Sequence, residues 1–144
     1  MMIIGLVASD DVRISASYRI LDCPGRVRTD SGREGSPGTY ENGPDVQIRL
    51  GFAGINDIAL TAVNRDVYSI IGRQVKESSP LRNTMFVGYA NGFANTGYII
   101  SDDAFGRNTF QALGTRLRPG CAEPGIVSNF TDMIYDHMGL SSPL

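Results

Sequence analysis

The chain has 144 residues, of which 42% are hydrophobic and 19% charged, a composition typical of one globular domain. Its net charge is −2, and 13 basic against 15 acidic residues give no polybasic surface for nucleic acid. No apolar run approaches the roughly 18 residues that span a bilayer. We therefore expect a single domain over residues 1–144, with no transmembrane segment and no nucleic-acid partner.

The first residues, MMIIGLVASDDV, have neither the basic start nor the small-residue cleavage site of a secretory signal. Cytoplasmic localisation is the resulting prediction. The two cysteines, Cys23 and Cys121, lie far apart and lack the spacing of metal ligands. Two reduced thiols are expected in a cytoplasmic protein, with a disulfide as the alternative.

Apolar and polar residues alternate strictly from residue 12 to residue 20. This pattern predicts a half-buried strand with its apolar side against the core. Its polar side, which contains Ser15 and Arg19, is expected to face water, as in an antiparallel or edge strand.

Glycines and prolines then interrupt any regular period from Cys23 to Asp45, and this segment is expected to be one long loop. Loops of this length in compact domains are usually functional or disordered. Arg26 and Arg33 lie within it, where they are either solvated loop charges or contacts for a ligand.

The rest of the sequence predicts the elements of an α/β fold. Residues 46–50 alternate again, and the apolar run at residues 58–63 is typical of a strand buried on both faces. Apolar residues at helical spacing follow from residue 67 to residue 75, and a strand is expected at residues 85–89. Together they predict a parallel strand-helix-strand crossover in a mixed sheet, followed by a C-terminal helix at residues 126–138.

Ligands in open α/β sheets bind beyond the carboxyl ends of the parallel strands, where two segments of this chain are expected. One is residues 64–68, in which Asp66 is either a helix cap or a site residue. The other is residues 90–98, whose glycines and asparagines permit close approach to a ligand, or form an ordinary tight turn.

The sequence resembles neutral, non-lysosomal ceramidases over nearly its whole length, in the segments CPGRVRTDSGREG, GPDVQIRLGF and IALTAVNRDVY. A longer stretch, SSPLRNTMFVGYANGFANTGYIISDDAFGRNTFQALGTRLRPGCAE, is similar to the part of that family around a glycine-bounded tyrosine. The order of these segments is that of the family. The resemblance covers only the C-terminal part of the family's catalytic domain.

The resemblance implies roles for particular residues. In the family, two histidines, a glutamate and a tyrosine hold a zinc ion whose water attacks the amide of an N-acyl sphingoid base. The glutamate position falls on Asp66 and the tyrosine position on Tyr98, which are therefore the candidate catalytic and metal-binding residues. Asn64, Asn91 and Asn95 are candidate substrate-binding residues, together with the two loop arginines.

The histidine ligands belong to a region that this chain does not contain. Its one histidine, His137, lies on the predicted C-terminal helix, where a surface or dipole-complementing role is expected. Asp66 is also shorter than glutamate by one methylene, which draws its oxygens back by roughly 1.5 Å from a metal that tolerates little change in distance. The isolated chain is therefore expected to hold no zinc tightly, although zinc is possible with a partner chain.

Three functions follow from this balance. The chain is part of a split zinc-dependent amide hydrolase, or it is a metal-free isomerase, cyclase or lyase that uses Asp66 and Tyr98 as acid and base, or it is a non-catalytic binding domain. The expected ligand is a hydrophobic or amide-containing small molecule. A domain of this kind without its remaining part exposes apolar surface, so a homodimer or a larger partner subunit is expected.

Overall fold

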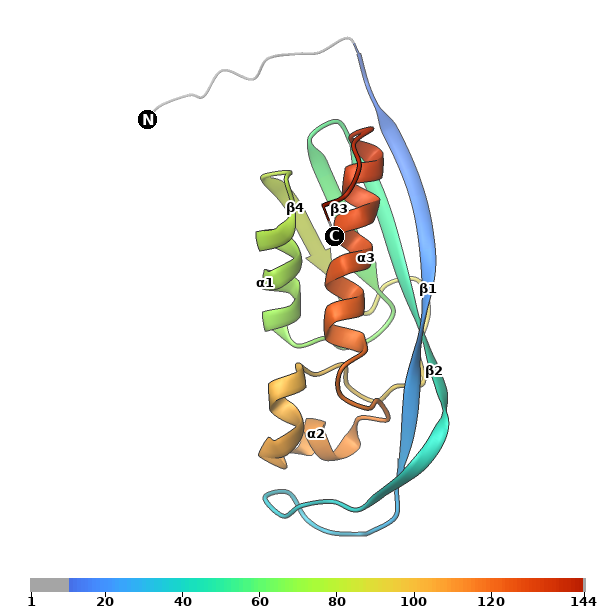
Figure 1. Cartoon of the computed structure of the whole chain (residues 1–144), viewed down its shortest axis with the longest axis vertical. Helices are drawn as coiled ribbons and strands as arrows, with labels where there is room; N and C mark the ends of the chain where they lie inside the picture. Colours follow the sequence, from blue (N-terminus) through green and yellow to red (C-terminus); the bar gives the residue numbers. More distant parts are fainter. Residues whose placement is uncertain (1–10, 144) are drawn as a thin grey trace, which may run out of the picture.

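A computed structural model describes residues 11–143 as a mixed α/β structure (Figure 1). The strands are β1 (Ile14–Arg28), β2 (Tyr40–Ile55), β3 (Ile58–Val63) and β4 (Asn83–Val87). The helices are α1 (Ser69–Ser78), η1 (Asp102–Arg107), α2 (Phe110–Gly114) and α3 (Ala122–His137). None of the helices in this part of the chain has the length and apolarity needed to cross a bilayer.

The four strands form one sheet in the order β1-β2-β3-β4. The pairs β1–β2 and β2–β3 are antiparallel, whereas β3 and β4 are parallel and are joined through α1. Helices α1 and α3 pack on one side of this sheet (Figure 1). The predicted mixed sheet, parallel crossover and C-terminal helix are all confirmed.

The predicted long loop from residue 23 to residue 45 is wrong. Strand β1 continues to Arg28 and β2 begins at Tyr40, and these two residues pair with each other. The ladder shifts register between Cys23 and Gly25, which accommodates the missing N–H of Pro24 within an edge strand. The β1–β2 ribbon therefore extends past β3 and β4 toward α2 (Figure 1), and the connecting loop is confined to residues 29–39.

Asp30 closes this shorter loop. Its carboxylate accepts bonds from the Arg28 guanidinium and from the backbone N–H groups of Gly32 and Thr39. The Arg28 bond, aided by the two N–H groups, holds the pKa of Asp30 well below its usual range. The loop is thus ordered by one ionised side chain rather than by a regular ladder.

The strand register divides the sheet into two faces. Side chains of paired residues lie on the same face, so the pairs Ala53↔Leu60 and Leu60↔Met85 identify one face across three strands. We call this face, which lies opposite α1 and α3, the open face. Its residues are Ile14, Ala16, Tyr18, Ile20, Asp22, Gln47, Arg49, Gly51, Ala53, Ile55, Ile58, Leu60, Ala62, Asn83, Met85 and Val87.

The other face, which we call the covered face, packs on α1 and α3. Its core includes Ile48, Leu50, Ile126 and Phe130, each with 0% exposure. Strand β3 was expected to be buried on both faces, but only its covered-face residues are fully buried, and Ile58 on the open face is 38% exposed. The run of apolar residues therefore reflects an apolar outer surface rather than a second packed layer.

The prediction for the two sides of β1 is also wrong. The polar residues Ser15 and Arg19 lie on the covered face, where Arg19 reaches Asn129, Asp132 and Asp136 of α3. The apolar side of the strand is the exposed one, with Ile14 70% and Tyr18 60% exposed. Helix α3 supplies polar partners along β1, and this reverses the usual orientation of an alternating strand.

Cys23 and Cys121 form a disulfide that joins β1 to the residue before α3, with their Cα atoms 5.7 Å apart. The expectation of two reduced thiols is therefore wrong, and the alternative is correct. Cys23 is fully buried in the main core, and Cys121 is partly buried and packs against it. Disulfides are typical of oxidising compartments, so this bond weighs against the predicted cytoplasmic localisation, which stays untested.

His137 is buried at the end of α3 rather than exposed at the surface. Its Nε2 lies 2.8 Å from the carbonyl oxygen of Asn56, and its Nδ1 lies 2.6 Å from the Ser15 hydroxyl. A carbonyl oxygen only accepts, so Nε2 carries the proton in this pair. A Cβ on Gly54 would lie 2.5 Å from Nδ1, so this position on β2 needs glycine. His137 thus fastens α3 to β1 and to the β2–β3 turn.

Candidate functional site

Asp66 and Tyr98 lie side by side beyond the carboxyl end of β3. An isolated parallel bridge pairs Val67 with Ile99, and the N–H of Ile99 donates to the carbonyl oxygen of Asp66 at 2.9 Å. Asp66 and Tyr98 each precede a bridge residue, and paired strands lie about 4.8 Å apart. The structure therefore brings together two residues that are 32 positions apart in sequence, while their catalytic role stays a prediction.

Asp66 does not cap the helix that follows it. Helix α1 begins after Tyr68, its N-cap has no side-chain bond, and its first turn has no acidic residue. The capping interpretation of Asp66 is therefore wrong. Asp66 is half-buried, and its backbone lies next to that of Tyr98 because the two residues precede the bridge between Val67 and Ile99.

Packing fixes the ring of Tyr98. It belongs to a small second core around Ile100, Ala104 and Ala112, and it meets Phe110 edge-on with ring centroids 5.9 Å apart. Tyr68, which follows the bridge on the other strand, packs into the same cluster. The ring is thus held by η1 and α2, so its hydroxyl has a defined position relative to the sheet edge.

Arg65 is a residue of this region that the sequence analysis missed. Its Nε donates to the carbonyl oxygen of Gly97 at 2.5 Å, and its guanidinium carbon lies 3.8 Å from the Phe93 ring centroid. Its Nη1 is buried and has no partner among the described residues. Arg65 directly precedes Asp66, and through this bond it holds the loop that precedes Tyr98. Two features of the sequence could have indicated this role of Arg65. It is adjacent to Asp66, and the segment at residues 90–98 contains aromatic residues on which a guanidinium can stack.

Four of the five predicted substrate-binding residues line one cleft of about 570 Å³: Asn64, Asn91, Asn95 and Arg26. Volumes of this size are typical of small-molecule sites. Neither Asp66 nor Tyr98 lines it. The fifth residue, Arg33, lies on the exposed loop between β1 and β2 and is not part of the cleft.

Two of these side chains already have structural partners. The Oδ1 of Asn64 accepts from the backbone N–H of Arg49 at 2.9 Å, which joins the end of β3 to β2. Arg26 donates to the carbonyl oxygens of Ala112 and Thr115 and stacks 3.6 Å above the Tyr40 ring centroid. Burial lowers the pKa of Arg26. Asn91 and Asn95 are exposed, and their side-chain amides have no hydrogen-bond partner among the described residues.

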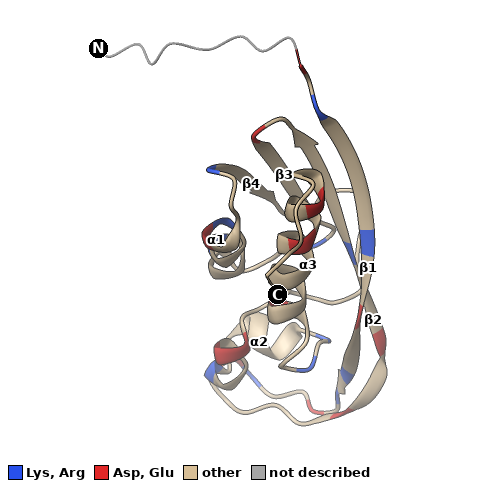
Figure 2. Ribbon diagram, turned by 45° about the horizontal axis from the view of Figure 1, so that its top comes forward, with Lys and Arg blue, Asp and Glu red and all other residues tan. Residues whose placement is uncertain are grey.

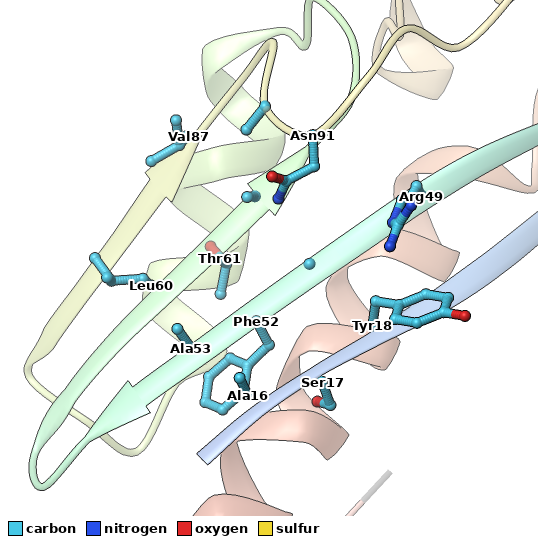
Figure 3. Close-up of a pocket in the computed structure, with 13 residues that line it drawn as sticks. Ala16, Ser17, Tyr18, Arg49, Phe52, Ala53, Leu60, Thr61, Val87 and Asn91 are labelled. Atoms are coloured by element: carbon cyan, nitrogen blue, oxygen red, sulfur yellow. The ribbon is translucent and has the colours of Figure 1, made fainter. Parts of the chain in front are cut away.

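A second hollow, of about 560 Å³, lies on the open face and adjoins the first through Arg49 and Asn91. Its floor consists mainly of small or apolar residues of the four strands, and Figure 3 shows Tyr18 and Arg49 beside each other at one side of it. The Arg49 guanidinium carbon lies 4.3 Å from the Tyr18 ring centroid. The hollow on the open face is thus mainly apolar, whereas the adjoining cleft is lined by amide and arginine side chains.

The donor set does not fit a zinc ion by itself. Between residues 11 and 143, no group of three or more His, Cys, Asp or Glu side chains is arranged to hold a metal. Asp66 and Tyr98 provide two oxygen donors, whereas a catalytic zinc site usually has three protein ligands. Both ring nitrogens of His137 are engaged near the opposite end of the sheet. These residues alone therefore do not form a zinc site.

Comparison with known proteins identifies the fold. No family model matches the sequence, and no curated protein matches it. A solved structure of a ceramidase complexed with C2 is similar, with a TM-score of 0.58 at 13% sequence identity. The similarity covers 91% of this chain and 31% of that chain. The chain therefore has a ceramidase-like fold and spans about a third of the length of the ceramidase that it matches.

Proposed function

We propose that the chain is a ceramidase-like domain of a split zinc-dependent amide hydrolase, in which a second polypeptide supplies the histidine ligands. The observation that carries this proposal is the pair Asp66 and Tyr98, which the parallel bridge holds side by side at the carboxyl end of β3. The ceramidase-like fold supports it. The partial coverage of that ceramidase agrees with a site that needs additional residues.

In this assembly, Asp66 and Tyr98 contribute two oxygen ligands from fixed backbone positions. The Arg65 bond to Gly97 and the ring contact of Tyr98 with Phe110 restrict movement of both. The exposed amides of Asn91 and Asn95 hydrogen-bond an amide or hydroxyl of the substrate. The apolar hollow beside them suits a substrate with a hydrocarbon chain.

A second candidate is a metal-free enzyme, and the incomplete donor set favours it. Without a metal, the Asp66 carboxylate acts as a base and the Tyr98 hydroxyl as an acid toward one bound molecule. Such an enzyme is an isomerase, cyclase or lyase that acts on a hydrophobic small molecule. If neither Asp66 nor Tyr98 affects any reaction, the remaining hypothesis is a non-catalytic binding domain.

The test measures zinc and amide hydrolysis together. Purified chain is expected to retain zinc at well below one equivalent after dialysis. A histidine-bearing polypeptide that copurifies with it should restore about one equivalent and hydrolysis of a fluorescent N-acyl sphingosine. Asp66→Asn and Tyr98→Phe should each lower that activity at least about a hundredfold, because each removes a group that contacts the reacting centre.

Matched controls separate this effect from folding. Asp136→Asn and Tyr135→Phe make the same chemical changes on α3 and should leave activity unchanged. Asp136→Asn should lower stability by no more than about 1 kcal/mol, since its pair with Arg19 is exposed. Activity of the isolated chain that depends on Asp66 but not on zinc would support the metal-free alternative. Full activity of both site variants in the complex would refute the catalytic role of this pair.

A further inference from the structure

The cleft of about 570 Å³, which we call the arginine cleft, holds basic side chains without acidic partners. Arg26, Arg49 and Arg116 line it, from β1, β2 and the segment before α3. None of these three arginines forms an ion pair with a described residue. Asp45 is the one acid among the described residues that line the cleft, so its lining has a formal excess of two positive charges.

The three guanidinium groups differ in what already holds them. Arg26 donates to two carbonyl oxygens and stacks on Tyr40, so its charge has a fixed position. The guanidinium of Arg49 lies over Tyr18, and Arg116 is exposed. Carbonyl groups and aromatic rings do not neutralise a guanidinium, so the arginine cleft keeps a positive field that suits an oxyanion.

The apolar hollow on the open face adjoins this cleft. It has a volume of about 560 Å³, and the residues that line it include Ala16, Ala53 and Leu60. Arg49 and Asn91 line both spaces, which therefore meet at these side chains. Figure 2 shows no charged residue on β3 or β4, whereas basic residues lie on the β1–β2 ribbon. The combined space is thus apolar at one end and positively charged at the other.

The turn at residues 89–92 places two residues other than glycine in the left-handed region. Tyr89 and Asn91 have φ angles of 55° and 63°. A bulky residue is uncommon in this region, and such strain clusters at functional sites. The turn brings the Asn91 amide over Gly51, where a Cβ would lie 3.1 Å from the amide nitrogen. Figure 3 shows this amide pointing toward the strands at one side of the hollow.

We propose that the arginine cleft and the apolar hollow together bind a single-chain amphiphile with a phosphate head group. A phosphomonoester carries a charge of about −1.5 to −2 near neutral pH, and guanidinium groups bind its oxygens through paired hydrogen bonds. Arg49 and Arg116 donate to the phosphate, and the Asn91 amide donates to it where the two spaces meet. The hydrocarbon chain lies in the hollow and covers part of the open face.

This binding goes beyond the proposed hydrolase function. Neither Asp66 nor Tyr98 lines the cleft or the hollow. The ligand therefore needs neither a metal nor a second polypeptide, and its binding can be measured on the isolated chain.

Two-dimensional NMR of the isotope-labelled chain measures this binding. Octyl phosphate, kept below its micelle concentration, should bind at least about tenfold more tightly than inorganic phosphate, because its chain buries apolar area in the hollow. It should also bind at least about tenfold more tightly than octyl glucoside, whose head group is uncharged. Octyl phosphate should shift the amide signals of Ala53 in the hollow and of Asn95 in the cleft, whereas inorganic phosphate should shift only those of the cleft.

Variants in each space separate the two contributions. Arg49→Gln and Arg116→Gln should each weaken octyl phosphate binding about tenfold, because each removes a charge-assisted hydrogen bond. Ala53→Leu fills part of the hollow, and it should weaken octyl phosphate binding without affecting inorganic phosphate. Arg82→Gln makes the control change at an exposed arginine before β4 and should bind octyl phosphate as wild type does. Circular dichroism confirms that each variant is folded.

Three results would overturn the proposal. Absence of saturable octyl phosphate binding, or equal affinity for octyl glucoside, would mean that the arginines do not recognise the head group. Equal affinity for inorganic phosphate and octyl phosphate would mean that the hollow takes no hydrocarbon chain. Wild-type affinity in both arginine variants would place the anion elsewhere. None of these measurements involves zinc or hydrolysis, so a failure here is distinct from a failure of the proposed hydrolase function.

Discussion

The two faces of this sheet differ in what covers their side chains. On the covered face, α1 and α3 bury Ile48, Leu50 and Phe130. The polar residues of β1 that lie on this side find partners on α3, including His137 and Asp132. The open face is largely apolar between its polar ends, and no helix between residues 11 and 143 packs on it. Along β1, the polar side chains are therefore the ones that face the helices, and the apolar side chains are the exposed ones.

This comparison shows the limit of alternation as a signal. A period of two establishes that a segment is extended, but it leaves open which stripe meets the core. The assumption that apolar residues face inward holds when water is the only alternative environment. In β1, the polar surface of α3 lies on one side and an exposed apolar face on the other, so the assumption fails.

The largest expected effect concerns the disulfide that anchors β1 to α3 on the covered face. The double variant Cys23→Ala/Cys121→Ala should lose about 2–5 kcal/mol of unfolding free energy, since the bond closes a loop with a sequence separation of 98 residues. Urea unfolding of wild type with and without a reductant measures it. If reductant changes wild type by less than about 1 kcal/mol, the covered face is held by packing alone.

A matched pair of isoleucines tests the two faces directly. Ile126→Ala, in α3 at 0% exposure, should cost about 2–5 kcal/mol because it leaves a cavity. Ile14→Ala, at 70% exposure on the open face, should change the unfolding free energy by no more than about 0.5 kcal/mol. Both are measured by urea unfolding at the same protein concentration. Equal costs would mean that the open face is buried within the monomer.

The smallest effect is expected from the polar stripe of β1. Arg19→Met removes the contacts to Asp132 and Asp136, which are 3.4 Å long and at least a third exposed. Such pairs contribute about 0.2–1 kcal/mol, and added salt should reduce the difference further. Thermal unfolding at low and high salt gives the comparison. A loss above about 2 kcal/mol would instead make these contacts the main attachment of α3 to β1.

Much of the fold was predictable from local pattern. Strand β3, helix α1 and strand β4 have clear periods, and their order fixed the parallel crossover. The β1–β2 ribbon was not predictable, because its glycines and prolines have the composition of a loop. The pairing of Arg28 with Tyr40 and the anchoring role of Asp30 depend on contacts between the two strands, which no single segment displays.

The candidate site was predictable in part. The topology rule and the resemblance together placed Asp66 near Tyr98, since both identify residues beyond parallel strands. Arg65 was missed because its role depends on the Gly97 carbonyl and the Phe93 ring, which are brought near only by the loop conformation. Arg26 was given a ligand role because its acceptors, Ala112 and Thr115, lie far along the chain.

The cross-link between Cys23 and Cys121 also affects the rate at which the chain folds. The bond between Ser15 and His137 joins residues 122 positions apart, and contacts of such high sequence separation slow folding. With the disulfide formed, the same two residues are separated by a path of about 25 residues, which lowers the entropy cost of closure by roughly 1.4 kcal/mol. Oxidised chain should therefore place α3 on β1 faster than reduced chain, so the order of oxidation and folding decides how long the apolar strands stay unprotected.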